Sequence, residues 1–258
     1  MKKYFFIIII SLSTLVTFAQ DDPYLLRMHY VELEGDIQSW INYELEYNKK
    51  LAKLAVDDGK WDGWQMWQSQ SNYNQFIFFH HFKNPTQFEK FPGWEILNDE
   101  NAKRIGLKKP ESPNVNSKGN KPMELFQITS TALSGTQSEY FVINEYSTSS
   151  PLIFVNNNEL WGEMMVTPKL EQNPGMNFAA GIKLLSDNTD EINYNGISFD
   201  GFSSLTSLIE SQAYFEGKWD NPNGELQAFI KAANEAKLSN FAENKRSSFW
   251  KVIGSTWD

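Results

Sequence analysis

Histidine and tryptophan are the side chains of this sequence best suited to chemistry or ligand recognition. The chain of 258 residues has three histidines, His29, His80 and His81. A histidine with a pKa near its ordinary value of ~6.5 can transfer protons at neutral pH. His80 and His81 are adjacent on a predicted strand, so only one of them can share a sheet face with His29. We expect His29 and His81 to line one interior cavity. We predict no metal site, because the three histidines cannot meet on that face.

Two tryptophans and one aspartate complete the candidate ligand-binding residues. On a strand, Trp61 and Trp67 point to one face and Trp64 to the other, and such rings suit contact with a sugar or a planar ligand. A weak repeat within the chain, with an offset of 121 residues, matches Asp200 to Phe79. We expect Phe79, and therefore Asp200, to face the interior cavity. The candidate ligand-binding residues are His29, His81, Trp64, Trp67 and Asp200. The alternative is that the histidines are hydrogen-bonded core or edge groups and that the rings fill the space between two sheets.

Several kinds of active site are excluded by what the sequence lacks. It has no cysteine, so a thiolate nucleophile and a thiolate metal site are ruled out. It also lacks G-x-S-x-G, a glycine-rich phosphate loop and H-E-x-x-H. Asp57, Asp58 and Asp62 do not have the spacing of a calcium loop, and a helix end followed by a turn explains them. No catalytic residue can be named, and we predict no cofactor.

The charge of the chain limits its partners. The formal net charge is −9, with 32 acidic and 23 basic residues. A surface of that sign repels phosphate backbones and anionic lipid headgroups. We therefore expect a small-molecule ligand and no nucleic-acid partner, while the oligomeric state is not specified by the sequence.

The first 19 residues are typical of a secretory signal peptide. Lys2 and Lys3 precede an apolar stretch that extends to Val16, and Ala19 is a small residue ahead of Gln20. The apolar stretch is shorter than the ~20 residues that a membrane span needs. We expect a soluble mature protein that is exported, either periplasmic or secreted, with no membrane span after signal cleavage.

Hydrophobic periodicity predicts the order β-α-β-β-α-β for the first part of the mature chain. In chain order the predicted elements are a strand at 24–34, a helix at 36–56, strands at 61–69 and 74–83, a short helix from residue 84, a loop at 106–122 and a strand at 123–133. Asp36 and Asn84 are predicted to cap the two helices.

The same order of elements is predicted again in the second part. The predicted elements are a strand at 139–147, a helix capped by Asn157 or Asn158, strands at 177–185 and 192–199, a helix capped by Ser203 or Ser204, a helix at 224–244 and a final strand at 246–257. Asn72-Tyr73-Asn74 matches Asn193-Tyr194-Asn195 at an offset of 121 residues. We interpret the repeated order as an internal duplication. The alternatives are two unrelated α+β halves or one larger mixed sheet.

This arrangement resembles the dimeric α+β barrel superfamily, which includes antibiotic-biosynthesis-type monooxygenases and stress-responsive barrel proteins. The resemblance rests on element order and strand patterning over residues 24–257. It implies an α+β fold of two ferredoxin-like β-α-β-β-α-β units in tandem, whose sheets pack face to face as an intramolecular barrel. The predicted organisation is a signal peptide at 1–19, one ferredoxin-like unit at 20–135 and a second unit at 136–258.

The resemblance also bears on ligands. Proteins of this group bind small ligands or haem between sheet and helices, and some are oxygenases that use no metal. Haem-binding relatives place an axial histidine on a helix, whereas each histidine here lies on a predicted strand, which disagrees with haem binding.

Three functions are compatible with the sequence. The first is an exported protein that binds a small apolar or aromatic ligand in a cavity between the two sheets. The second is a cofactor-independent oxygenase or isomerase-like enzyme that uses the same cavity, with His29 or His81 in proton transfer. The third is a structural or interaction protein with a filled core.

Overall fold

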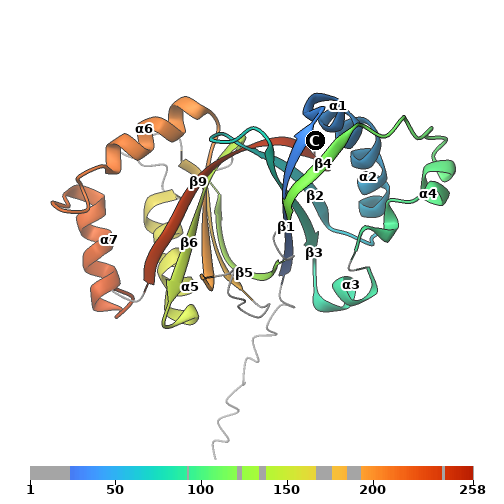
Figure 1. The fold of residues 1–258 in the computed structure, drawn as a ribbon. Coiled ribbons are helices and arrows are strands. Elements are labelled where there is room, and N and C mark those ends of the chain that lie inside the picture. The colour runs from blue at the N-terminus through green and yellow to red at the C-terminus, as the bar shows by residue number, and fades with distance from the viewer. Residues whose placement is uncertain are drawn as a thin grey trace, which may run out of the picture.

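The described chain forms one antiparallel sheet of nine strands, with helices packed on the outside of it (Figure 1). The computed structural model describes residues 24–91, 93–120, 124–133, 138–166, 176–184, 193–239 and 242–257. The signal peptide predicted at 1–19 lies outside these residues. Within them, no helix combines the length and the apolar character that crossing a bilayer requires.

The first half, residues 24–133, follows the predicted order of elements. Its strands are β1 (Tyr24–Gly35), β2 (Gly63–Ser69), β3 (Gln75–Phe82), β4 (Val115–Asn120) and β5 (Glu124–Leu133). Its helices are α1 (Ile37–Tyr43), the π-helix η1 (Glu44–Asn48), α2 (Lys49–Asp57), α3 (Pro85–Lys90), the 3-10 helix η2 (Trp94–Ile96) and α4 (Asp99–Arg104). The loop predicted at 106–122 is wrong in part, because β4 forms there and its backbone pairs with the end of β1.

The second half, residues 138–257, repeats this succession among its described residues without a counterpart of β4. Its strands are β6 (Tyr140–Thr148), β7 (Met176–Leu184), β8 (Gly196–Phe202) and β9 (Ala242–Ser255). Its helices are α5 (Pro151–Trp161), the π-helix η3 (Gly162–Val166), α6 (Leu205–Phe215) and α7 (Gly224–Glu235). The helix predicted at 224–244 is too long, because α7 ends at Glu235 and β9 begins at Ala242.

Helix starts follow from side chains that accept hydrogen bonds from free backbone N–H groups. Asp36, Asn84 and Ser204 each accept such a bond at the start of α1, α3 and α6, as predicted. The cap predicted at Asn157 or Asn158 is wrong, since α5 begins earlier. Its cap is Ser150, followed by Pro151 at the first helical position.

The strand order explains how the two halves make one barrel. The order is β5-β1-β3-β2 in the first half and β9-β6-β8-β7 in the second. β2 pairs with β9 and β5 pairs with β7, so the outer strands of each half are hydrogen-bonded to those of the other. Eight strands therefore close into a barrel, whereas the sequence suggested two separate sheets facing each other. Helices α1–α4 lie on one side of it and α5–α7 on the other (Figure 1).

The interior of the barrel holds a core to which both halves contribute. The rings of Trp67 and Phe141 stack with their centroids 4.2 Å apart, and Phe79 lies 5.9 Å from Phe199. Other buried members are Leu26, Met28, Ile77, Phe126, Ile143, Tyr194, Ile197 and Trp250. Burial of these large side chains stabilises the contact between the halves by ~1.5–3 kcal/mol each. Two larger cores lie outside the barrel, one under the helices of each half, and a smaller cluster of Tyr47, Leu51 and Ala102 lies among the helices of the first half.

The offset of 121 residues does not describe the correspondence of β3 and β8. Ile77 and Phe79 face the barrel interior, and so do Ile197 and Phe199, which requires an even offset such as 120 on these strands. A shift of one residue exchanges the two faces of a strand. Asp200 was expected on the interior face, and this is wrong: its partner across β6 is Val142, which belongs to the outer core.

Candidate functional site

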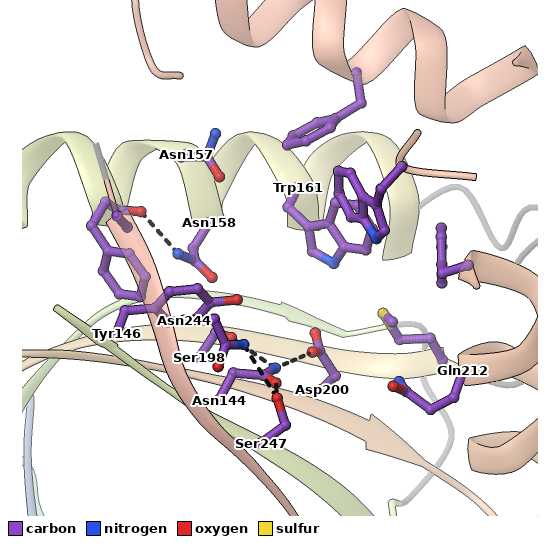
Figure 2. Close-up of a pocket in the computed structure, with 16 residues that line it drawn as sticks. Asn144, Tyr146, Asn157, Asn158, Trp161, Ser198, Asp200, Gln212, Asn244 and Ser247 are labelled. Carbon is purple, nitrogen blue, oxygen red and sulfur yellow. Dashed lines mark hydrogen bonds between the residues drawn. The ribbon is translucent and has the colours of Figure 1, made fainter. Parts of the chain in front are cut away.

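A cavity of about 600 Å³ lies in the second half, between the outer face of the sheet and helices α5, α6 and α7 (Figure 2). Its base comes from strands β6, β8 and β9, and its walls come from the helices and the turn that joins α6 to α7. The residues that line it are Asn144, Tyr146, Phe154, Asn157, Asn158, Trp161, Met176, Ser198, Asp200, Gln212, Phe215, Trp219, Phe229, Ala242, Asn244 and Ser247. The volume is in the range of small-molecule sites.

The base of the cavity is a hydrogen-bonded polar network across three strands. The Asn144 side-chain N–H group donates to the Asp200 carboxylate at 3.0 Å and to Ser198 Oγ at 3.2 Å. The Ser247 hydroxyl donates to the Asn144 carbonyl oxygen at 2.6 Å. Asn144 thereby orients Asp200, and the network presents hydroxyl, amide and carboxyl groups to the cavity (Figure 2).

Asp200 is the ionisable group of this network. Its carboxyl lies at the base of the cavity with protein on all other sides, and burial raises its pKa to about 7 while the Asn144 hydrogen bond acts in the opposite direction. Near neutral pH such a carboxyl exists in both protonation states. It can therefore accept a proton or a hydrogen bond from a molecule in the cavity.

Aromatic rings form the walls above this base. Trp161 and Trp219 lie with their rings 6.0 Å apart at 23°, and Phe229 meets Trp161 edge to face at 5.1 Å. Phe215 packs against both tryptophans. Such surfaces bind flat apolar groups by stacking and by excluding water. The cavity thus combines apolar walls with a polar base.

The side chains that line this cavity do not fit a bound haem. The chain has histidines only at 29, 80 and 81 and no cysteine, and none of those histidines lines the cavity. Tyr146 is the phenol among the described lining residues; burial raises its pKa, and Ser198 and Asn244 hydrogen-bond to it. A neutral phenol engaged in this way does not supply the axial ligand that haem iron takes from histidine, thiolate or tyrosinate.

The predicted site residues of the first half are not brought together. His29 pairs with Phe78 and Arg27 with His80, so His29 and His80 share the outer face of the sheet, while His81 faces the barrel interior. The expectation that His29 and His81 line one cavity is therefore wrong.

Burial keeps these imidazoles neutral. His80 lies between Trp61 at 4.7 Å and Trp94 at 4.5 Å, and neither of its ring nitrogens has a hydrogen-bond partner among the described residues. Burial lowers the pKa of His80 well below its ordinary value and that of His81 to about 3.

The two candidate tryptophans also face opposite ways. Trp67 belongs to the barrel interior, and Trp64 lies fully buried in the outer core of the first half. Trp61 precedes β2 and joins Trp64 in that core, so its predicted placement beside Trp67 is wrong. Of the predicted ligand-binding residues, only Asp200 lines the cavity. Four asparagines and two tryptophans that line this cavity were missed, because their approach depends on how the helices pack on the sheet.

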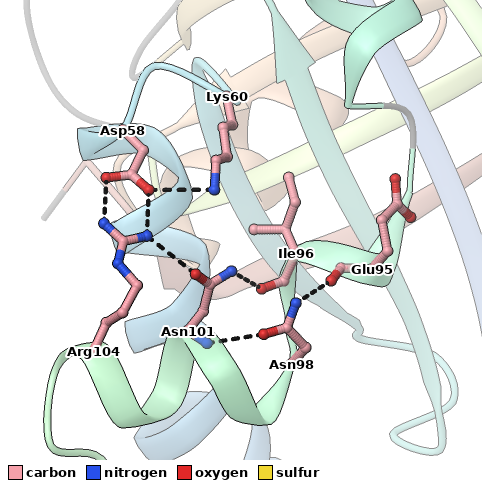
Figure 3. A network of polar contacts seen from close by, with 7 residues as sticks. All are labelled: Asp58, Lys60, Glu95, Ile96, Asn98, Asn101 and Arg104. Atoms are coloured by element: carbon pink, nitrogen blue, oxygen red, sulfur yellow. Dashed lines mark hydrogen bonds and ion pairs between the residues drawn. The ribbon is translucent and has the colours of Figure 1, made fainter.

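A second polar network, in the first half, has a structural role (Figure 3). Arg104 donates from both terminal nitrogens to the Asp58 carboxylate, at 2.8 and 3.1 Å, and Lys60 lies 3.3 Å from the same group. These cations hold the pKa of Asp58 at about 2. The network attaches α4 to the end of α2, and within the described residues no group of three acidic or histidine side chains is placed to hold a metal ion.

Comparison with known proteins establishes the fold. Neither a protein-family model nor a curated protein matches the sequence. The structure is similar to that of an anthrone oxidase-like protein, with a TM-score of 0.53 and 14% identity over 91% of this chain and 93% of that chain. It is also similar to a proposed monooxygenase from Lactobacillus acidophilus NCFM, with a TM-score of 0.51 and 7% identity over 91% of this chain and 95% of that chain. At these identities the likeness shows the fold alone, an α+β barrel.

Proposed function

We propose that the second-half cavity binds a small, uncharged aromatic molecule that carries a hydrogen-bond donor. The observation that carries this proposal is Asp200, an acceptor at the base of a cavity whose walls are aromatic. Among the described lining residues there is one acidic side chain and no lysine or arginine. An anionic ligand would meet the carboxylate without a compensating cation, which makes it a poor fit.

Binding of 2-naphthol, compared with that of 2-methoxynaphthalene, tests the proposal. Both probes are flat and uncharged, and only 2-naphthol has a hydroxyl that can donate to Asp200. By titration calorimetry at pH 8 we expect 2-naphthol to bind about ten-fold more tightly, since a hydrogen bond to a charged acceptor contributes ~1.5 kcal/mol. The preference should weaken as the pH falls from 8 to 5, because Asp200 becomes protonated.

The Asp200→Asn variant should lose both the preference and its pH dependence. Asp220→Asn is the matched control, since Asp220 is exposed and does not line the cavity. Equal binding of the two probes to the native chain, or no binding of either, would contradict the proposal and favour a structural or interaction role.

A second candidate function is oxygenation without a cofactor. Two observations favour it: a carboxyl of near-neutral pKa that faces an aromatic cavity, and a fold shared with an anthrone oxidase-like protein. Asp200 would take a proton from an activated CH₂ group, and dioxygen would oxidise the resulting carbanion. Overall, CH₂ and O₂ yield C=O and H₂O.

Oxygen uptake with anthrone as substrate tests this second function. We expect uptake above the uncatalysed rate with the native chain, rising with pH through about 7, and ~100-fold less with Asp200→Asn. Uptake that is equal in the two proteins would remove Asp200 from such a reaction. Binding of 2-naphthol without oxygen uptake would leave the protein as a binding protein.

Export and duplication are also part of the proposal. Residues 1–19 support a signal peptide, and a mature chain that begins at Gln20, as determined by mass spectrometry of protein from the producing cells, is the expected result. Shared strand order and the π-helices η1 and η3, each of which follows the first helix of its half, support two ferredoxin-like units from one duplicated unit.

A further inference from the structure

A second apolar hollow of about 530 Å³ lies on the outside of the second half, next to the cavity. It is lined by Ile209, Gln212, Ala213, Phe215, Glu216 and Trp219. Gln212, Phe215 and Trp219 line both spaces. The cavity and this outer groove are therefore adjacent, and three side chains form the boundary between them.

The outer groove exposes apolar side chains that no packing requirement explains. Ile209 is 55% exposed and Trp219 is 54% exposed, although both are large. Trp219 lies on the turn between α6 and α7, where Gly217 has a positive φ of 72° that favours glycine. Exposed apolar surface costs free energy in water and commonly marks a binding surface.

We infer that the outer groove is a second subsite of the cavity, which holds an apolar chain attached to the aromatic ligand. This inference rests on the proposed function and adds the substrate class: a phenol-like head that reaches Asp200 and an alkyl substituent that leaves past Trp219. The two spaces share Gln212, Phe215 and Trp219 as lining residues, which supports a single ligand that extends across this boundary. Glu216, the charged side chain among the described residues of the groove, disfavours a substituent that ends in an anion.

A series of 4-alkylphenols tests the inference. 4-Ethylphenol, 4-butylphenol and 4-hexylphenol have the same head and differ only in chain length. Burial of one CH₂ group increases affinity by up to about four-fold. For the native chain, calorimetry should show affinity rising two- to four-fold with each CH₂ beyond the ethyl group.

Ile209→Asp is the variant that isolates the groove. Ile209 lines the groove and not the cavity, and it is exposed on α6. Its replacement should therefore leave the fold unchanged, together with the head site, which is the part of the cavity at Asp200. We expect 4-hexylphenol to bind this variant at least ten-fold more weakly, with 4-ethylphenol within two-fold of native affinity. Leu152→Asp is the matched control, because Leu152 is 70% exposed on α5 and lines neither space.

The outcomes separate this inference from the proposed function. If 4-ethylphenol binds and Ile209→Asp keeps the native dependence on chain length, the subsite is wrong and the head site stands. If no alkylphenol binds, the proposed function fails and the subsite with it. If Ile209→Asp instead converts an oligomer to a monomer in size-exclusion chromatography without changing the chain-length dependence, the groove is a contact between copies of the chain, and the inference is overturned.

Discussion

The two halves share a plan of strands and helices, but the space between sheet and helices holds a cavity in the second half and a packed aromatic core in the first. In the first half the corresponding space is filled. Trp61, Trp64, Phe78 and His80 are fully or almost fully buried there, and Trp94 packs on His80. In the second half Ser198, Asn144 and Asp200 face the equivalent region and leave it open.

Strand pairing gives the correspondence residue by residue. His29 pairs with Phe78 in the first half, and Asn144 pairs with Ser198 in the second. Two residues further along the same face, His80 corresponds to Asp200. Large rings thus stand in one half where small polar side chains stand in the other, and the difference in side-chain volume decides whether a ligand can enter.

The comparison teaches that the barrel and the site are separable. The interior positions are apolar in both halves, for example Ile77 and Ile197 or Phe79 and Phe199, because they form the joint core. The outer positions differ, since each half packs its own helices. Conserving the inner face maintains the barrel, while substitution on the outer face can create or close a cavity.

Filling the cavity with the first-half residue is expected to have the largest effect. Ser198→Phe puts the ring of Phe78 at the corresponding position of the second half. We expect 2-naphthol binding to weaken at least 100-fold because the ring occupies the cavity, and the thermal midpoint to fall moderately because Asn144 and Tyr146 lose their hydrogen bonds to Ser198. Ser203→Phe, an exposed position outside the cavity, is the control. Native affinity in Ser198→Phe would show that the probe binds elsewhere.

The raised pKa of Asp200 predicts a stability change of intermediate size. Between pH ~4 and 7 the folded state retains a proton that the unfolded state releases, so this carboxyl lowers stability as the pH rises through that range. We expect the free energy of unfolding of Asp200→Asn, measured in urea, to exceed that of the native chain by ~1–2 kcal/mol at pH 8. The difference should be smaller at pH 5.

Glu44 of the first half allows the same test on the other side of the barrel. It is buried, burial raises its pKa to about 7, and Asn48 donates to it at 2.9 Å. Glu44→Gln should shift stability with pH in the same direction as Asp200→Asn and leave 2-naphthol binding unchanged. If the difference in unfolding free energy between either variant and the native chain is the same at pH 5 and at pH 8, the pKa of that carboxyl is not raised in the folded protein.

His80 predicts an effect that is absent at neutral pH and is confined to acidic pH. Burial chiefly lowers its pKa, with Arg27, His29 and His81 acting in the same direction, while Glu95 lies near Arg27. The unfolded state takes up a proton below pH ~6.5 that the folded state does not, so stability falls as the pH decreases. His80→Phe should make this fall shallower by up to ~1.4 kcal/mol per pH unit in urea unfolding. An unchanged slope would show that His80 is protonated in the folded protein.

Much of the fold could be predicted from local patterns. Alternation located β1, a run that is apolar on both faces located β3, and three- to four-residue spacing located the helix that starts at Ile37, because each pattern reflects which faces are buried. The strand β4 escaped prediction because its residues, Val115–Asn120, are polar and rich in turn formers. Only pairing with β1 makes them a strand.

The candidate site was harder to predict. Asp200 was selected, but for the wrong face, because an offset chosen from Asn72-Tyr73-Asn74 and Asn193-Tyr194-Asn195 reverses every side chain of β8. The histidines and tryptophans drew attention as reactive or stacking groups, and most of them fill cores.

Residue types and their local spacing were enough to establish the order of strands and helices, the apolar character of the barrel interior and the absence of thiol chemistry. Tertiary structure alone decided which face each side chain occupies and where space remains. A cavity is the volume that packing leaves unfilled, and that volume depends on side chains from strands and helices far apart in the chain.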